Sequence, residues 1–324
     1  MAAAISFLVV LAVAGVDALL GAPPPGTAKV PALLAFGDSV VDTGNNNYIR
    51  TIIRANFPPY GRDFPGRKPT GRFSDGKISI DFLASALGVK EMVPPYLDKN
   101  LSMNDLKTGV SFASAGSGYD NASCRTMSAM TVERQLQLFK EYKAKVGGVP
   151  EKTLYLLCWG TNEVVQHFTI ADGKTEPQYS DFMVQRASST IQALVDLGAR
   201  LVVVVGAPPV GCVPAQRIIA GGVRRQCATN RNQVALLFNR KLSQEISRLN
   251  GKLPGVKIVN IDLYSLVSDV MHRYQALASV LCNFASPLCG DPPQYVFWDS
   301  YHPTERAYKL MVDEVVDRYL GFLK

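Results

Sequence analysis

Charged residues and histidines are both scarce in this sequence. Charged residues form 19% of its 324 residues, and it contains three histidines. The 34 lysines and arginines outnumber the 27 acidic residues and give a net charge of +7, but apart from Arg224–Arg225 they are scattered. Proteins that bind nucleic acid usually gather their positive charge on one stripe. We therefore expect no nucleic-acid partner, whereas a mildly basic surface favours an acidic matrix such as a cell wall.

Long apolar runs are absent except at the N-terminus. The run Ala2–Val16 ends at Asp17, short of the ~20 residues that a membrane-spanning helix needs. An apolar start followed by the small residue Ala18 is typical of a secretory signal peptide. We expect residues 1–18 to be a signal peptide, with Ala22 as the alternative cleavage point, residues 19–30 to be a flexible leader, and residues 31–324 to be one domain. The protein is therefore predicted to be secreted.

The six cysteines lack the spacing of a zinc finger, so we expect no structural metal. In a secreted chain they can form disulfides, although sequence alone does not fix the pairing. The segments Cys212–Cys227 and Cys282–Cys289 each enclose a short loop and are candidate pairs. Cys158 lies in an apolar run, which favours a buried thiol, and Cys124 has no obvious partner. Candidate glycosylation sites, which agree with secretion, are the sequons at Asn100 and Asn121.

Short apolar runs alternate with longer segments of helical periodicity. The apolar runs predict strands at Ala32–Phe36, Val110–Ala113, Thr153–Trp159, Arg200–Gly206 and Val256–Ile261. The periodic segments predict helices at Lys77–Leu87, Thr131–Lys145, Asp181–Leu197, Cys227–Asn250, Leu263–Ala278 and Pro303–Leu320. Repeated strand–helix alternation is typical of a parallel sheet with helices on both faces. We therefore expect an α/β fold whose ligands bind at the carboxyl ends of the strands.

Polar segments lie where this fold would place a site. Three follow predicted strands and one precedes the last predicted helix: Gly37-Asp38-Ser39, Ser114–Gly118, Gly160-Thr161-Asn162 and Asp299–Pro303. Ester hydrolysis needs an activated hydroxyl, a base and an acid that orients the base. Ser39 is the candidate nucleophile, His302 its base and Asp299 the orienting acid. The reaction also needs donors for the oxyanion, which backbone N–H groups at glycines and the Asn162 side chain offer.

Each segment alone has a simpler interpretation. Gly-Asp-Ser is usually a turn, and Asp299 three residues before His302 is more often a structural hydrogen bond than a catalytic one. The other histidines, His167 and His272, lack an aspartate at this spacing. The sequence around Ser111 approximates a nucleophile elbow, but it lies inside a predicted strand and not at a strand-to-helix turn. The site is predicted from the four segments together, because three of them follow predicted strands and the fourth precedes the last predicted helix.

Several spaced blocks of the sequence resemble those of the plant GDSL esterases/lipases, which belong to the SGNH hydrolase superfamily. The blocks are Phe36–Ser39 with Asp42–Asn47, Pro69–Gly76, Ser111–Gly118, Gly160–Glu163, Pro208–Pro214 and Asp299–Glu305. The resemblance extends from about Pro31 to the C-terminus. Three features depart from the family pattern. Glu163 replaces the usual Asp, Ser111 replaces a frequent Asn, and the segment around Cys282–Cys289 is shorter.

The resemblance implies a flavodoxin-like three-layer α/β/α fold with a five-stranded parallel sheet. It implies a Ser-His-Asp triad made of the three residues proposed above. It also implies an oxyanion hole formed by the N–H groups of Ser39 and Gly116 and the side chain of Asn162, with Gly118 as the alternative glycine. No metal or organic cofactor is implied.

The expected activity is a carboxylester hydrolase that works through an acyl-enzyme. Its substrate is expected to be an acyl lipid, a cutin-type ester or an acetylated cell-wall polysaccharide, and acyl transfer to an alcohol is chemically available as well. The alternative is a catalytically silent secreted protein of the same fold with a binding or structural role. No stable protein partner is implied, and we expect a monomer.

Overall fold

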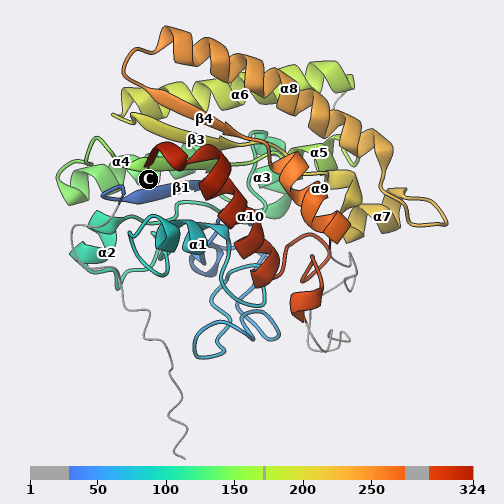
Figure 1. The fold of residues 1–324 in the computed structure, drawn as a ribbon, viewed down its shortest axis with the longest axis horizontal. Coiled ribbons are helices and arrows are strands. Elements are labelled where there is room, and N and C mark those ends of the chain that lie inside the picture. Colours follow the sequence, from blue (N-terminus) through green and yellow to red (C-terminus); the bar gives the residue numbers. More distant parts are fainter. Residues whose placement is uncertain (1–28, 171–172, 274–291, 324) are drawn as a thin grey trace, which may run out of the picture.

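The computed structural model describes residues 29–170, 173–273 and 292–323 (Figure 1). Within these residues the sheet has the strand order β1-β2-β3-β4, and neighbouring strands are parallel. The strands are β1 (Leu33–Gly37), β2 (Leu154–Cys158), β3 (Leu201–Val205) and β4 (Lys257–Ile261). Every residue of the first three is buried. Such continuous apolar strands require helices on both faces of the sheet.

The sheet in the described residues has four strands, and the prediction of five is wrong. The predicted strand Val110–Ala113 lies beside β1, where Ser111 pairs with Ala35 in the parallel sense. The pairing is an isolated bridge. The chain enters this segment through Gly109, whose φ is +111°, and leaves it for a turn at 115–116. The extended stretch between Gly109 and this turn is therefore too short to form a regular ladder of hydrogen bonds with β1.

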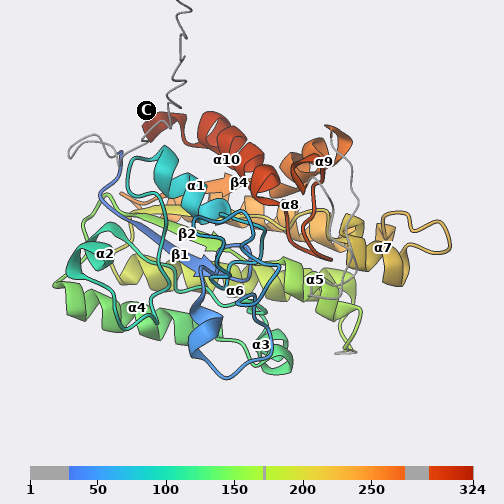
Figure 2. The same cartoon turned by 90° about the horizontal axis from the view of Figure 1, so that it is seen from below.

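The helices form two layers around the sheet. They are α1 (Ser79–Ala86), α2 (Met103–Thr108), α3 (Asn121–Met127), α4 (Val132–Val146), α5 (Thr161–His167), α6 (Glu176–Asp196), α7 (Pro214–Ala220), α8 (Thr229–Lys252), α9 (Leu263–Arg273) and α10 (Glu305–Tyr319). One apolar cluster packs α1, α9 and α10 on one face, and another packs α4, α6 and α8 on the other. Figure 2 shows α1 and α10 on one side of the sheet and α4 and α6 on the other. This is the predicted three-layer α/β/α architecture.

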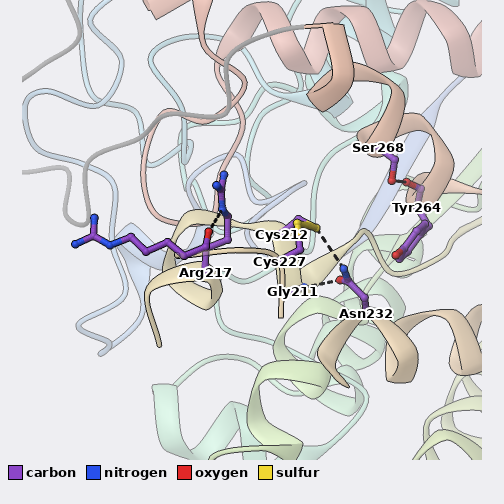
Figure 3. The surroundings of a disulfide bond; sticks show 8 residues. Gly211, Cys212, Arg217, Cys227, Asn232, Tyr264 and Ser268 are labelled. Atoms are coloured by element: carbon purple, nitrogen blue, oxygen red, sulfur yellow. Dashed lines mark hydrogen bonds between the residues drawn. A yellow bond between two sulfur atoms is a disulfide. The ribbon is translucent and has the colours of Figure 1, made fainter. Parts of the chain in front are cut away.

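Of the two candidate disulfides, Cys212–Cys227 is confirmed and the other pair lies outside the described residues. This disulfide joins the two ends of the segment 212–227, which contains α7 (Figure 3). The Asn232 side chain at the start of α8 lies beside it, accepting from the Gly211 N–H at 2.7 Å and donating to Cys212 Sγ at 3.2 Å. Cys124 and Cys158 are buried free thiols.

None of the helices in the described part of the chain is long and apolar enough to cross a bilayer. The proposed signal peptide and most of the leader precede residue 29 and lie outside the described residues.

Candidate active site

Ser39, His302 and Asp299 come together at the carboxyl edge of the sheet. Ser39 follows β1, and the other two residues lie in the loop before α10. His302 Nε2 lies 2.7 Å from Ser39 Oγ, and His302 Nδ1 lies 2.7 and 2.9 Å from the two oxygens of Asp299. One nitrogen of the ring therefore faces the hydroxyl while the other faces the carboxylate. This is the arrangement in which a histidine can take a proton from a serine.

Asp299 is held in place by several donors. Its Oδ1 accepts from the N–H groups of Tyr301 (2.8 Å) and His302 (2.7 Å), and its Oδ2 accepts from the Tyr60 hydroxyl (2.7 Å). Burial by itself raises the pKa of Asp299, but the charge and hydrogen bonds of His302 outweigh it and lower the pKa overall. The carboxylate therefore stays ionised beside the imidazole.

Aromatic rings enclose the imidazole from the side. The Phe73 ring lies 4.7 Å from the His302 ring, and Tyr60 packs against Phe73 at 5.8 Å. The His302 side chain is 14% exposed and that of Asp299 7%. Tyr60 and Phe73 come from the long loop between β1 and α1, and sequence reasoning did not identify either of them. The Pro69–Gly76 block contains Phe73, but its periodicity gives no sign of a contact with a residue near the C-terminus.

The loop after the predicted second strand brings Gly116 to the cavity wall beside Ser39 and Asn162. Gly116 has φ +82°, a conformation that an L side chain rarely adopts. Among the described residues, no partner accepts a hydrogen bond from the N–H of Ser39 or of Gly116. The Asn162 side chain donates one bond to Ser117 O at 2.8 Å, which leaves its second amide hydrogen available. With respect to the described residues, three donors near the serine are therefore free.

The alternative glycine, Gly118, does not line the cavity. A Cβ atom at this position would lie 2.7 Å from Glu163 Oε1, so Gly118 is needed for close packing against that carboxyl. Glu163 accepts from the Tyr119 N–H and is fully buried. Burial raises its pKa to about 8. Glu163, which replaces the usual Asp of the family, therefore packs against the loop that carries Gly116 and Gly118.

A buried glutamine joins the two loops that carry the serine and the glycine. Gln135, on α4, accepts from the Gly37 N–H at 3.0 Å and donates to Gly37 O at 2.9 Å and to Ser117 Oγ at 3.0 Å. Trp159 Nε1 also donates to Ser117 Oγ, at 3.2 Å. Gln135 is 0% exposed, so all these bonds form away from water. The end of β1 is thereby tied to the loop that carries Gly116.

The polar residues that follow Ser39 form a second tie to the same loop. Asp42 accepts from the N–H groups of Gly44, Asn45 and Ala115 at 2.7–2.9 Å. Asn46 donates to Ala115 O at 3.0 Å. Burial raises the pKa of Asp42 to about 6. The Asp42–Asn47 block is therefore a scaffold for the loop and not a set of reacting groups.

The remaining candidates lie elsewhere. Ser111 is buried and donates from its hydroxyl to Val41 O at 2.7 Å, so it is structural. His167 stacks on Tyr179 with ring centroids 4.6 Å apart, and His272 is exposed near the end of α9. Neither of these histidines lines the cavity. The described residues hold no group of three or more histidine, cysteine or acidic side chains placed to bind a metal ion.

The two sequons differ in their surroundings. Asn100 is exposed in the loop before α2. Asn121 is only partly exposed at the start of α3, its Oδ1 is buried, and Ser123 of the same sequon is 2% exposed. In the folded chain only the first sequon presents its asparagine openly.

The Ser39 hydroxyl opens into a cavity of about 460 Å³. Gly116, Asn162, Asp299 and His302 share its wall with many apolar side chains. A concave, largely apolar site with a few converging polar groups is the usual form of a small-molecule site.

The sequence matches a known family over most of its length. Residues 33–315 match the GDSL-like Lipase/Acylhydrolase family. Among curated relatives in Arabidopsis thaliana, GDSL esterase/lipase EXL3 is 39% identical over 92% of this chain and 90% of its own length. GDSL esterase/lipase At5g42170 is 38% identical over 91% of this chain and 88% of its own. A solved structure of a putative GDSL-like lipase from Parabacteroides merdae is 15% identical, with a TM-score of 0.46 over 91% of this chain and 97% of that one.

The family match covers most of the chain, including the segment with Ser39 and the segment with His302. The curated relatives cover nearly the whole sequence at more than one third identity. The chain belongs to the GDSL-like lipase/acylhydrolase family and is a serine hydrolase that acts on ester bonds.

Proposed function

We propose that Ser39, His302 and Asp299 form the catalytic triad of this esterase. His302 Nε2 removes the Ser39 proton as Oγ attacks the acyl carbonyl, and Asp299 keeps the imidazole in the tautomer that makes Nε2 the base. The imidazolium then protonates the leaving alcohol. In the second step His302 activates a water molecule that releases the acid from Ser39. The observation that carries this proposal is the 2.7 Å contact from Nε2 to Oγ at the wall of the cavity.

The oxyanion that forms in both steps is proposed to lie between Ser39, Gly116 and Asn162. The free N–H groups of Ser39 and Gly116 and the second amide hydrogen of Asn162 support this, because preorganised donors stabilise charge that develops in the transition state. The bond from Asn162 to Ser117 O holds the side chain in position before substrate arrives. No metal or organic cofactor takes part in this scheme.

The triad is tested by comparing two serine variants. Ser39→Ala should abolish turnover of p-nitrophenyl acetate and labelling by a fluorophosphonate probe, since the probe reacts with an activated serine. Ser111→Ala is the matched control, because it removes a buried hydroxyl from the elbow-like segment. It should keep both turnover and labelling, with circular dichroism checking that each variant is folded. Activity retained by Ser39→Ala, or lost only in Ser111→Ala, would refute the assignment.

The proposal also includes secretion of the protein from the cell. Residues 1–18 act as a signal peptide, residues 19–30 are a leader, and residues 31–324 form the catalytic domain of a secreted monomer. The apolar run Ala2–Val16, the sequons at Asn100 and Asn121 and the disulfide Cys212–Cys227 support an extracellular location. N-terminal sequencing of protein recovered from the medium should start at Leu19 or Pro23, and an intact start at Ala2 would contradict the proposal.

The substrate is proposed to be an acyl ester of a lipid, a cutin-like polymer or a cell-wall component. The largely apolar cavity supports an ester whose acyl part is hydrophobic. The same acyl-enzyme also permits transfer to an alcohol in place of water.

A further inference from the structure

The walls of the cavity at Ser39 fall into two parts that differ in exposure. One part, called the outer branch here, is lined by residues of α3, of α5 and of the segment after α5, where Met127 and Ile170 are more than one third exposed. The other part, called the inner branch, is lined by one face of the sheet and by the helices α9 and α10. Its walls are formed by Leu156, Cys158, Val205 and Ile261 from the sheet and by Val267, Met311, Val312 and Val315 from the helices.

The inner branch is lined by side chains of the buried apolar core. Val205 and Val315 are each 8% exposed although a layer of helix or sheet covers them. On the opposite face of the same strand, Val202 and Val204 are 0% exposed. Well-packed cores leave few voids larger than a water molecule. Val205 and Val315 both line the cavity at Ser39, so the inner branch, called the tunnel below, lies between the sheet and the helices.

The residues that line the tunnel extend across three spacings between neighbouring strands. The tunnel passes the carboxyl ends of β2, β3 and β4 after starting at Ser39, which follows β1. Three spacings between neighbouring strands amount to about 14 Å. A zigzag chain of C–C bonds of ~1.5 Å needs roughly ten to twelve carbons to span this length. An acetyl group would leave almost all of the tunnel empty.

The order of the chemical steps decides which part of the ester occupies which branch. The alcohol leaves after the first step and water must then reach Ser39, while the acyl group stays bonded to Oγ until the second step. The alcohol therefore needs the open branch beside Met127 and Ile170. The closed, apolar branch suits the part that remains attached.

We propose that the tunnel between the sheet and α9/α10 holds the acyl chain of the substrate, so that this enzyme acts on esters of fatty acids with about ten to twelve carbons. The inference rests on Ser39 being the nucleophile. It selects fatty acyl esters from the proposed substrate classes and assigns the alcohol part, whether lipid or polymer, to the outer branch.

The test compares p-nitrophenyl acetate with p-nitrophenyl dodecanoate. The native enzyme should have at least a ten-fold higher kcat/KM for the dodecanoate, because each buried methylene adds favourable binding. Val205→Phe narrows the tunnel and should lower the dodecanoate-to-acetate ratio by roughly ten-fold or more. Val165→Phe adds the same volume to the outer branch and should lower it much less. Val223→Phe, at a fully exposed loop position, controls for the added ring.

The opposite pattern, with the ratio falling in Val165→Phe and unchanged in Val205→Phe, overturns the proposal. So does a native enzyme that prefers the acetate, and that result leaves the assignment of Ser39 intact. Calorimetric titration of Ser39→Ala with dodecanoate tests the tunnel without catalysis and without altering the walls formed by the sheet and the helices. One-to-one binding with a negative heat-capacity change supports the proposal, and no binding contradicts it.

Discussion

Asp299 accepts hydrogen bonds from two directions, and the second one comes from a residue far away in the sequence. Its own loop supplies the N–H groups of Tyr301 and His302. The Tyr60 hydroxyl reaches it from the loop before α1. A carboxylate with a fixed orientation holds the imidazole in one plane, so we propose that Tyr60 acts on the reaction through Asp299, as a positioning residue.

Tyr60→Phe should lower kcat for p-nitrophenyl acetate about ten-fold, the equivalent of ~1.4 kcal/mol in the barrier. The phenyl ring preserves the contact with Phe73, but Asp299 loses a donor and with it a constraint on its orientation. KM should change much less, since the effect is on the reacting groups. Steady-state kinetics separate the two constants.

Tyr142→Phe is the control for this prediction. The Tyr142 hydroxyl donates a bond of the same length, 2.7 Å, to Leu106 O in the core. Losing it should reduce the stability of the fold and leave kcat unchanged. Equal losses of kcat in both variants would show that the effect of Tyr60 is merely structural.

At the scale of elements, the sequence predicted those that bury a continuous apolar surface. Strands β1 to β4 and the large helices α1, α4, α6, α8 and α10 lie within a few residues of their expected positions. For α9, Leu263–Arg273 is helical, and the remainder of the predicted helix Leu263–Ala278 lies outside the described residues. The first five residues of α6, which include Pro177, precede the predicted start at Asp181. Thr175 caps this end in a capping box with Gln178, and a proline is readily accepted in the first turn of a helix.

The short elements near the site could not be predicted in this way. Helices α3 and α5 have seven residues each, too few to show a periodic pattern. The loop before α3 carries the proposed oxyanion donor Gly116, and α5 itself contains Asn162. Their positions depend on tertiary contacts, such as the bond from Asn162 to Ser117 O, that no local pattern contains.

The same limit applies to the site residues. Ser39, Gly116, Asn162 and the Asp299–His302 pair follow strands or precede a helix, so topology alone gathers them at one edge of the sheet. Gln135 lies in the first turn of α4, where its position in the sequence is that of any polar helical residue. Its contacts with Gly37 and Ser117 join segments about 98 and 18 residues away. Only the packed structure reveals its role.

At the scale of the whole molecule, the protein buries several carboxyl groups behind the proposed site. Burial raises the pKa of Asp38 to about 7 and that of Glu163 to about 8. Unfolding exposes these groups and returns each pKa toward its ordinary value of 3.8 or 4.5. At pH values between the ordinary and the raised pKa of each group, the folded state therefore binds more protons than the unfolded state. In this range the free energy of unfolding falls as pH rises.

The sign can be worked out for Glu163. Below pH 4.5 the carboxyl is protonated in both states, and its favourable contribution to folding is fully present. As pH rises toward the folded-state pKa of about 8, the unfolded state gains from ionisation while the folded state cannot. Asp299 acts in the opposite direction, because its lowered pKa makes its contribution disappear as pH falls. The raised pKa of Glu163 thus favours folding at acid pH, whereas the lowered pKa of Asp299 favours folding above the ordinary pKa of 3.8.

Glu163→Gln removes this pH dependence, because an amide of the same shape replaces the neutral acid. The variant should match the native free energy of unfolding near pH 4.5 and exceed it at pH 9 by on the order of 4 kcal/mol, as the shift in pKa requires. Urea denaturation at the two pH values measures the difference. Glu151→Gln, at an exposed position in the loop before β2, should follow the native protein at both. A constant difference between Glu163→Gln and the native protein would mean that the buried carboxyl is ionised throughout.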